Sequence, residues 1–430
     1  MDQTRKTAFL VLKDVEERKA YSNIALANHI KVHRPPNVPF IRELVYGVVR
    51  NALYLDYIIS QFVKTPIDKL TSTDLTLLEM GLYQLIFMNS VPDHAAVDET
   101  VEIAKYYAKG KEGFVNGVLR QYLRDKDYVK LPDRAKDLTL YLSTKYSFEP
   151  WIIDMWLKEY GEEKTEELAT VLNETPQLCI RTNTLKIDSD ALTKRLEAQG
   201  IKVERDEDYP DLLVVQGENV LSNKMFSKEG LFSVQDKGSQ TVVEWVDAKP
   251  GETVIDVCAA PGGKTVAIAE DMKNIGVVKA FDIYLRKISL IEAEAERLGI
   301  SIIRAWSWDA TRIDSTLLNQ ADKVLVDAPC SGLGTARRKP EVKYKRFDNK
   351  MKNLPTRQFD ILKASANYVK PGGILIYSTC TIAKRENEDV VQSFINSNWE
   401  FEILEKVQLL PQTSDTDGFF ICKMKRKEKR

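Results

Sequence analysis

The chain contains 430 residues, 43% of them hydrophobic, which is enough for two or three domains with their own cores. Its 62 Lys and Arg residues balance 63 Asp and Glu residues, so binding to nucleic acid through overall basicity is excluded and would need a local basic surface. The five cysteines form no Cys-x-x-Cys pair and no apolar stretch is long enough to span a bilayer, so we expect a cytoplasmic protein without disulfides, metal or membrane partners.

The first 140 residues are predicted to form a helical domain. Apolar residues recur at three- and four-residue spacings, as in the run from Leu75 to Leu85, and turn signals separate such runs. Thr73 or Asp74 is the predicted cap of the helix that contains this run. Since no catalytic motif occurs here, we interpret this part as an interaction module, with a bundle that serves only as a scaffold as the alternative.

A small α+β segment is predicted to follow, so that residues 141–236 contain a linker and this segment. The stretch 126–150 is polar and is expected to connect the two parts. Strand patterns near 177–184, 201–204, 211–215 and 231–235 surround one helical pattern at 189–199. Ser239 is the predicted cap of the next helix.

The remaining residues, 237–430, are predicted to form a Rossmann-like α/β domain. Strand patterns at 253–258, 277–282, 301–306, 323–328 and 373–379 alternate with helical patterns at 264–272, 286–298, 356–369 and 386–397. That alternation predicts a parallel sheet with helices on both faces. The segment 418–424 is expected to add an antiparallel edge strand. Cys179 and Cys422 lie inside strand patterns and are interpreted as core residues.

A glycine-rich turn, Cys258-Ala259-Ala260-Pro261-Gly262-Gly263-Lys264, follows the first of these strands, and its small residues let the backbone approach a ligand closely. A phosphate-binding P-loop would require glycine at position 258, where cysteine stands, so we reject an ATPase. Asp282 ends the second strand and can accept both hydroxyls of a ribose, while Asp309, after the third strand, can contact the base or its surroundings. Without a GxGxxG pattern, this set fits S-adenosylmethionine better than a dinucleotide.

Two cysteines, Cys330 and Cys380, stand just after the fourth and fifth strands, beside the expected cofactor. A thiolate is a strong nucleophile, and its attack on C6 of a pyrimidine makes C5 reactive enough to accept a methyl group. Asp327 and Cys330 can aim at one point, and a carboxyl group beside N3 of the ring can stabilise developing charge. The second thiol can then assist loss of the C5 proton. One carboxyl group, two thiols and a methyl donor therefore suit methyl transfer to a pyrimidine.

A basic run follows Cys330 at residues 337–346. Chemistry at a pyrimidine carbon requires an unpaired or extruded base, and RNA offers such bases. Positive side chains can hold the phosphates around that base and aromatic side chains can stack on it, whereas a solvated surface is the alternative. The residues assigned to phosphates are Arg337, Arg338, Lys343, Lys345 and Arg346, and those assigned to stacking are Tyr344 and Phe347.

Three motifs, DVCAAPGGKT, VDAPCSGLGT and YSTCTIAKRENEDVV, resemble those of the RNA cytosine-C5 methyltransferases that use two cysteines. In the N-terminal part, ELVYGVVRN, LLEMGLYQLIFM and EGFVNGVLRQYLR resemble the NusB-like domain of a branch that methylates a cytosine of 16S rRNA. The resemblance implies a NusB-like domain, a small RRM-like segment and a Rossmann-like catalytic domain. It also implies that Cys380 attacks C6 and that Cys330 assists release. The S-adenosylmethionine site would be lined by residues 258–264, Asp282, Asp309 and Asp327, and Asp327 would also face the cytosine.

The implied partner is 16S rRNA, gripped in part by the helical domain, and we expect a monomer. A tRNA substrate is the nearest alternative, against which only the NusB-like segment speaks. A non-catalytic RNA-binding or antitermination factor with a methyltransferase fold is a third interpretation. Such a factor would have no reason to keep both Cys330 and Cys380.

Overall fold

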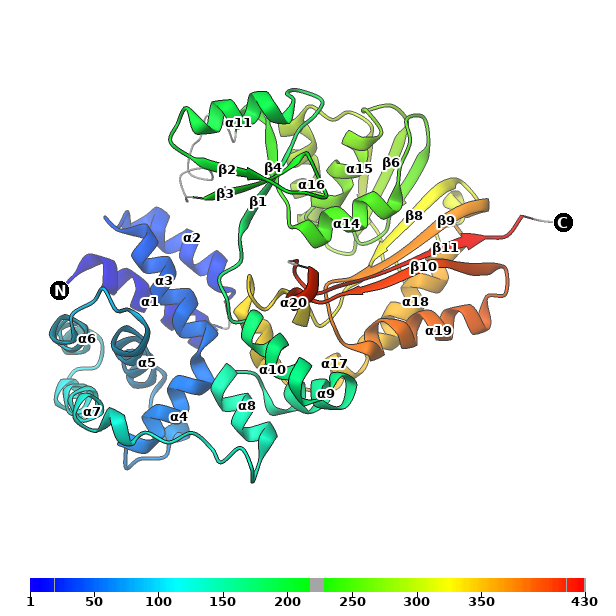
Figure 1. Cartoon of the computed structure of the whole chain (residues 1–430). Coiled ribbons are helices and arrows are strands. Elements are labelled where there is room, and N and C mark those ends of the chain that lie inside the picture. The colour runs from blue at the N-terminus through cyan, green and yellow to red at the C-terminus, as the bar shows by residue number, and fades with distance from the viewer. Residues whose placement is uncertain (19, 217–227, 415, 429–430) are drawn as a thin grey trace. The chain divides into compact units, whose positions relative to one another are not determined.

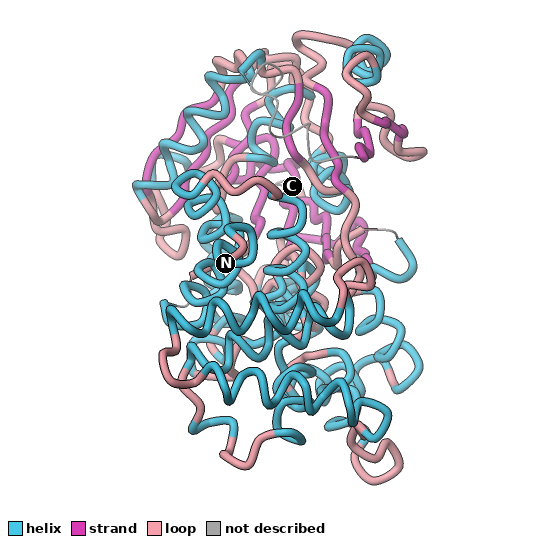
Figure 2. Tube along the Cα trace, turned by 90° about the vertical axis from the view of Figure 1, so that its left-hand side faces the viewer, coloured by secondary structure: helices cyan, strands magenta, loops and turns pink. Residues whose placement is uncertain are grey.

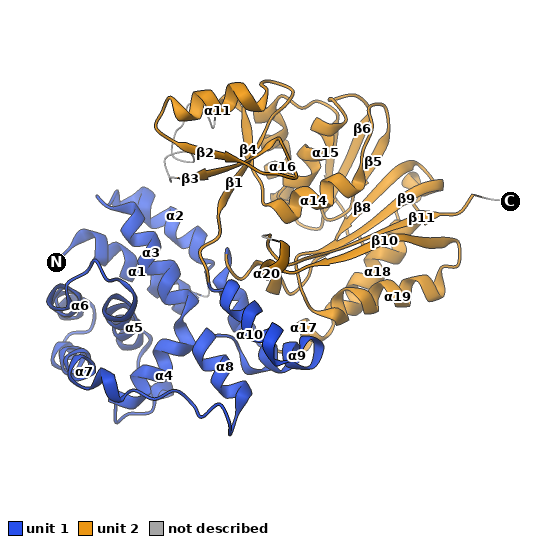
Figure 3. Ribbon diagram, viewed as in Figure 1, with its two compact units in different colours: residues 1–173, 338–346 blue, residues 174–337, 347–430 orange. Residues whose placement is uncertain are grey.

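The computed structural model describes residues 1–18, 20–216, 228–414 and 416–428. The chain divides into two compact units (Figure 3). The helical unit contains Met1–Asn173 and Arg338–Arg346, and the α/β unit contains Glu174–Arg337 and Phe347–Arg430. Part of the predicted α+β segment, residues 217–227, lies outside the described residues. The domain boundaries at 140 and 236 remain predictions.

The regular elements of the helical unit are all helices, which confirms the predicted all-helical N-terminal region (Figure 2). They are α1 (Gln3–Arg18), α2 (Ser22–His33), α3 (Val38–Arg50), α4 (Ala52–Phe62), α5 (Ser72–Phe87), α6 (Asp93–Tyr107), α7 (Glu112–Asp125), α8 (Leu138–Tyr146), α9 (Pro150–Tyr160) and α10 (Glu162–Val171), with short 3-10 helices η1 (Ile67–Lys69), η2 (Lys126–Tyr128) and η5 (Pro340–Tyr344). Apolar faces of α1 to α7 share one core, which includes Leu44, Leu77 and Leu119. The predicted linker 126–150 contains the helix α8. Asp137 caps the start of that helix by accepting a hydrogen bond from the Leu140 N–H at 2.8 Å.

Two helix caps lie two or three residues before their predicted positions. The side chain of Thr71 caps α5 by accepting a hydrogen bond from the Asp74 N–H at 3.1 Å. In the α/β unit, Asp236 caps the next helix by accepting a hydrogen bond from the Ser239 N–H at 3.2 Å. Asp74 and Ser239 therefore supply backbone donors in the first turn rather than capping side chains.

The segment 338–346 completes the core of the helical unit, which corrects part of the predicted RNA-binding run. Lys343 is fully buried, and its Nζ donates to the Arg50 carbonyl oxygen at 2.6 Å and to Asn173 Oδ1 at 2.7 Å. Burial lowers the pKa of Lys343 well below its ordinary value, which disfavours the charged form. The Tyr344 hydroxyl donates to the same Arg50 carbonyl at 3.0 Å. Contrary to the prediction, Lys343 is thus a core residue rather than a phosphate ligand, and Tyr344 packs against the core instead of offering a stacking face.

The α/β unit begins with a small antiparallel sheet, as the strand patterns predict. Its strands are β1 (Leu178–Thr182), β2 (Lys202–Arg205), β3 (Leu212–Gln216) and β4 (Phe232–Val234), in the order β2-β3-β1-β4, with the helix α11 (Ser189–Glu197). Ile180, Leu192 and Leu213 form the centre of its core. A buried ion pair of 3.0 Å between Arg181 and Glu270 joins this small sheet to the rest of the unit.

The main sheet has seven strands in the order β10-β11-β9-β8-β5-β6-β7 (Figure 1). The strands are β5 (Thr253–Asp256), β6 (Val277–Asp282), β7 (Ile303–Ser307), β8 (Ala321–Asp327), β9 (Val369–Thr379), β10 (Phe401–Leu409) and β11 (Phe419–Arg426). The five strands from β7 to β9 in this order are parallel. The segment 418–424, predicted as an antiparallel edge strand, lies in β11, which is antiparallel to β9 as expected, but the edge itself is formed by β10, which pairs with the other side of β11. Buried cysteines occupy β1 and β11, at Cys179 and Cys422.

Helices cover both faces of the main sheet, as the alternating pattern predicts. Apolar side chains of α14 (Lys237–Val246), α15 (Gly263–Asp271) and α16 (Leu285–Leu298) share one core with the sheet, and those of α18 (Leu354–Ala366) and α19 (Glu388–Ser397) share another. Short helices fill the connections: η3 (Ser315–Leu317), η4 (Leu333–Thr335), η6 (Lys384–Glu386), α17 (Asn349–Lys352) and α20 (Pro411–Ser414). The strand order reverses at β5, which pairs with β6 on one side and β8 on the other. Ligands of open parallel sheets bind beyond the carboxyl ends of the strands at such a point.

Candidate active site

The two predicted thiols meet at the carboxyl ends of neighbouring strands. Cys330 follows β8 by three residues, and Cys380 follows β9 directly. β8 and β9 are parallel, with Asp327 opposite Ser378 in their register. This pairing brings the sulfur atoms of Cys330 and Cys380 to within 3.4 Å of each other, and both side chains are partly exposed.

The surroundings of Cys330 favour its protonated form. Its hydrogen bond with Cys380, then burial, and then the charges of Glu386 and Asp327 raise the pKa of Cys330 well above its ordinary value. Cys330 therefore holds a proton that it can share with the sulfur of Cys380. Burial, together with Asp256 and Asp327, likewise raises the pKa of Cys258 above its ordinary value.

Asp327, at the end of β8, is held by two partners. Lys264 Nζ lies 2.8 Å from its Oδ2, and the Ser378 hydroxyl donates to its Oδ1 at 3.0 Å. Burial of the Lys264 ammonium lowers its pKa, but the nearby charge of Asp327 raises it, and the net result is a raised pKa of Lys264. Lys264, predicted as a cofactor residue, thus binds the Asp327 carboxylate and, together with Ser378, fixes its orientation.

A cavity of about 260 Å³ opens beyond the ends of β5, β6 and β8. It collects the predicted residues Cys258, Ala260, Asp282, Asp309 and Asp327. The sequence patterns gave no indication of further lining residues, which include Ile283, Tyr284, Lys287, Pro329, Arg357 and Ile361. Tyr284 and Lys287 follow Asp282 within five residues, so that proximity could have indicated them as lining residues. Arg357 comes from α18, and nothing in the sequence around it indicates a place in the cavity.

The rest of the predicted turn shapes the backbone instead of lining this cavity. Gly262 has φ 109° at the start of α15, and a Cβ there would lie 3.2 Å from the Ile291 Cα. Ala259 is buried, while Pro261 and Gly263 line a second cavity, of about 410 Å³, beside β4. Ala259 and Gly262 of this turn are therefore closely packed, whereas Cys258 and Ala260 line the first cavity.

The lining of the first cavity fits a nucleoside cofactor. Asp282 Oδ1 accepts a hydrogen bond from the Tyr284 N–H at 3.1 Å, which orients a carboxylate suited to ribose hydroxyls. Asp309 accepts a hydrogen bond from the Thr311 hydroxyl at 2.8 Å and another from the Thr311 N–H. Burial raises the pKa of Asp309, but these two bonds lower it, and the net shift is downward. The pocket thus combines oriented carboxylates with apolar and aromatic side chains that can pack against a base.

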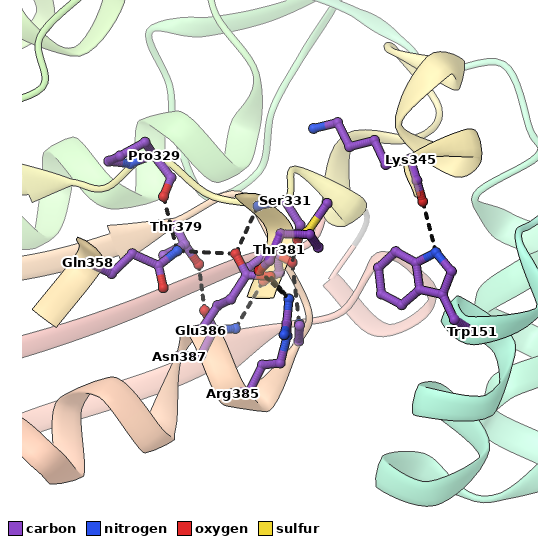
Figure 4. A network of polar contacts seen from close by, with 12 residues as sticks. Trp151, Pro329, Ser331, Lys345, Gln358, Thr379, Thr381, Arg385, Glu386 and Asn387 are labelled. Atoms are coloured by element: carbon purple, nitrogen blue, oxygen red, sulfur yellow. Dashed lines mark hydrogen bonds and ion pairs between the residues drawn. The ribbon is translucent and has the colours of Figure 1, made fainter. Parts of the chain in front are cut away.

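The remaining RNA-binding predictions differ in their structural surroundings. Arg337 is 7% exposed and forms an ion pair of 3.2 Å with the buried Asp417, so it is a structural residue rather than a phosphate ligand. Arg346 is exposed, and Arg338 and Lys345 are partly exposed. The Lys345 carbonyl accepts a hydrogen bond from the Trp151 indole at 2.8 Å, which fixes the backbone of this segment within the helical unit (Figure 4).

The histidines of α2 have a spacing of four residues that could suit metal ligands. His29 instead hydrogen-bonds Asp14 at 2.9 Å and stacks on His33. Over residues 1–18, 20–216, 228–414 and 416–428, no three His, Cys, Asp or Glu side chains gather as metal ligands. No helix within the same residues is long and apolar enough to cross a membrane.

Comparison with known proteins agrees with this architecture. Residues 243–425 match the family described as 16S rRNA methyltransferase RsmB/F, and residues 2–124 match the NusB family. Residues 148–220 match the ferredoxin-like domain of the RsmF/B-like methyltransferases. The predicted order of a NusB-like part, a small α+β part and a Rossmann-like methyltransferase part is therefore confirmed.

Full-length relatives and solved structures extend this match to the whole chain. The chain is 38% identical to the probable ribosomal RNA small subunit methyltransferase B of Bacillus subtilis over 98% of each chain, and 31% identical to that of Escherichia fergusonii over 96% of each. The crystal structure of PH0851 aligns with a TM-score of 0.85 at 26% identity, covering 100% of this chain and 99% of that one. A methyltransferase homologue from Pyrococcus horikoshii aligns with a TM-score of 0.60 at 28% identity, covering 67% and 98%. The chain therefore belongs to the family of ribosomal RNA small subunit methyltransferase B, whose members are S-adenosylmethionine-dependent methyltransferases.

Proposed function

We propose that this protein methylates C5 of a cytosine in 16S rRNA through a transient covalent bond between Cys380 and C6. The observation that carries this proposal is the pair of thiols, 3.4 Å apart, beside the held carboxylate of Asp327 and the nucleoside-type cavity. The names of the full-length relatives support small-subunit rRNA as the substrate.

The first half of the reaction activates a poor nucleophile. Cytosine C5 does not attack a methyl group readily, but addition of the Cys380 thiolate at C6 pushes the ring electrons toward C5. Asp327 is positioned by Lys264 and Ser378, so it can hold the N3 edge and stabilise the charge that develops on the ring. S-adenosylmethionine, when bound, supplies the electrophilic methyl group.

The second half releases the enzyme. The C5 proton must pass to a base while the bond between C6 and Cys380 breaks and its electron pair returns to that sulfur. We assign this step to Cys330, because its sulfur lies 3.4 Å from the leaving sulfur. To act as this base Cys330 must first release its own proton to solvent, and the proton taken from C5 then restores the thiol. The raised pKa of Cys330 makes that thiolate a stronger base than an ordinary cysteine thiolate.

The cofactor cavity yields the first prediction. Asp282 would hold the ribose of S-adenosylmethionine, so Asp282→Ala removes hydrogen bonds to a charged acceptor and should weaken binding of the cofactor about 10- to 100-fold. Isothermal titration with S-adenosylmethionine measures this change. Asp360→Ala removes an exposed carboxylate of α18 that does not line the cavity, and it should leave the dissociation constant unchanged. Equal affinities of both variants would place the ribose elsewhere.

An exposed aromatic ring of the α/β unit, flanked by two cations, supports binding of an unpaired RNA base. Phe347 is 41% exposed, with the Arg385 guanidinium 4.7 Å and the Lys352 Nζ 5.6 Å from its ring centre. Aromatic faces next to cations suit stacking with nucleotides and contact with their phosphates. We include Arg338, Lys345 and Arg346 in the proposed RNA contacts, and we exclude the buried Arg337 and Lys343.

Bisulfite sequencing of cellular RNA tests the whole proposal. Small-subunit rRNA from cells that contain the protein should keep one cytosine that resists conversion, and rRNA from cells without it should not. Supplying the wild-type chain should restore that cytosine, and supplying Cys380→Ala should not. A resistant cytosine that disappears from tRNA instead would favour the tRNA alternative.

A further inference from the structure

We propose that Glu386 and Asn387 are positioning residues that set the spacing between the thiols of Cys330 and Cys380. The inference rests on the proposed function, because it assigns a role in the same two-thiol reaction. Both residues are fully buried at the junction of η6 and α19, six and seven positions after Cys380. The sequence motif that carries them shows no role for either.

Glu386 fixes the peptide groups on both sides of Cys330, directly and through Gln358 (Figure 4). Its Oε2 accepts a hydrogen bond from the Ser331 N–H at 2.8 Å and from the Gln358 side-chain amide at 3.1 Å. The same Gln358 amide donates to the Pro329 carbonyl at 3.0 Å. The residues before and after Cys330 are therefore tied to one carboxylate.

Asn387 fixes the residues on both sides of Cys380 in the same manner (Figure 4). Its Oδ1 accepts a hydrogen bond from the Thr379 hydroxyl at 2.6 Å, and its Nδ2 donates to the Thr381 carbonyl at 3.0 Å. Nδ2 also donates to Gln408 Oε1 at 2.7 Å, which anchors the amide on β10. An asparagine is suited to this place because it needs both an acceptor and a donor.

The two arrangements are coupled. Glu386 and Asn387 are adjacent in the chain, and the hydroxyls of Ser331 and Thr381 hydrogen-bond each other at 2.7 Å. The residues that directly follow the two cysteines thus share a bond as well as neighbouring anchors. The side chains that make these bonds at the two cysteines are buried, which limits their movement, so the network can determine where the two sulfurs point; they are those of Ser331, Gln358, Thr379, Thr381, Glu386 and Asn387.

Burying a carboxylate costs desolvation free energy unless hydrogen bonds or an opposite charge compensate for it. Within the part of the chain that the structure describes, Glu386 Oε1 has no hydrogen-bond donor, and the Arg385 guanidinium lies 3.8 Å away. An apolar side chain would fill this place without that cost. Glu386 is explained if its single well-paired oxygen is needed to hold the Cys330 loop.

The first experiment measures the spacing of the thiols without RNA. Two adjacent thiols bind phenylarsine oxide together, with loss of water, and mass spectrometry of the native protein detects the adduct. The wild-type chain should bind one molecule, and Cys330→Ala and Cys380→Ala should bind none, which calibrates the signal. Glu386→Ala and Asn387→Asp should reduce capture at least about 10-fold, because each change breaks bonds beside one cysteine. Asp389→Asn, an exposed change two residues beyond Asn387, should capture normally.

Steady-state methylation of rRNA provides the second measurement. Glu386→Ala and Asn387→Asp should lower kcat about 100-fold, since a misplacement near 1 Å has an effect of that size, while KM for S-adenosylmethionine stays within about threefold. Glu386→Gln keeps an oxygen that accepts from both Ser331 and Gln358, so it should retain capture and most of kcat. This rescue separates a positioning role from a general loss of stability.

Normal arsenical capture together with normal kcat in folded Glu386→Ala and Asn387→Asp would overturn the inference. If Glu386→Ala does not fold, Asn387→Asp and Glu386→Gln still decide the matter, because they are nearly isosteric with the native side chains and should differ in capture. Loss of arsenical capture in Asn387→Asp but not in Glu386→Gln supports the inference. This result does not depend on RNA, so it would stand even if the wild-type protein proves inactive on cytosine. The positioning role and the proposed methylation of cytosine can therefore be refuted independently.

Discussion

Replacing Cys380 by alanine should abolish methyl transfer, with a fall in rate of about four orders of magnitude or more, as expected when a covalent nucleophile is removed. The reason is that C5 of the ring then lacks the electron density that addition at C6 provides. Binding of S-adenosylmethionine should change by less than about threefold, because Cys380 does not line the cofactor cavity. Transfer of a labelled methyl group to rRNA measures the first effect, and isothermal titration measures the second.

A cysteine outside the site supplies the control. Cys179 is buried in β1 of the small sheet, and Cys179→Ala should retain methyl transfer. Substantial turnover by Cys380→Ala would show that another group attacks the ring. Loss of cofactor binding by the same variant would point to collapse of the strand end rather than to missing chemistry.

Cys330→Ala should give the opposite kind of defect, a reaction that starts and does not finish. Cys380 can still add to C6 and C5 can still be methylated, but the group 3.4 Å from the leaving sulfur is missing. Protein should therefore accumulate on RNA as a complex that survives denaturation and migrates slowly in a denaturing gel. We expect most of the enzyme to be trapped within a few turnovers when rRNA and S-adenosylmethionine are in excess.

The double variant Cys330→Ala with Cys380→Ala identifies the bond in that complex. It should show no slow band, because the nucleophile is absent. A slow band in the double variant would mean that a different side chain is linked to RNA. If Cys330→Ala turns over normally and leaves no complex, proton removal from C5 must be assigned to another group.

Strand ends were predictable because the signal that places them is local. The apolar runs before Cys330 and Cys380 indicate buried parallel strands, and parallel neighbours must present their carboxyl ends at the same edge. The acids at 282, 309 and 327 follow from the same reasoning, and the cavity collects all three. The predicted caps lie two or three residues after the observed ones because several Ser, Thr and Asp residues stand close together, and sequence alone does not show which one bonds the exposed N–H groups.

Tertiary partners explain what the sequence did not predict. Lys343 lies in a run of charges that is typical of a surface, and its burial depends on acceptors at Arg50 and Asn173, 293 and 170 positions away. Glu386 and Asn387 have charged neighbours in sequence and are nonetheless buried, because they contact residues from β9, from β10 and from the loop after β8. No periodicity within one element reports such contacts.

The place of Lys343 also bears on how the protein is made. Synthesis delivers the first 173 residues of the helical unit long before residues 338–346, so the unit waits for its last core segment until most of the α/β unit has emerged from the ribosome. A fragment ending at 173 would leave the backbone carbonyl of Arg50 without the amine that meets it in the full chain. The bundle is therefore finished late, by a piece of chain that begins eight residues after Cys330.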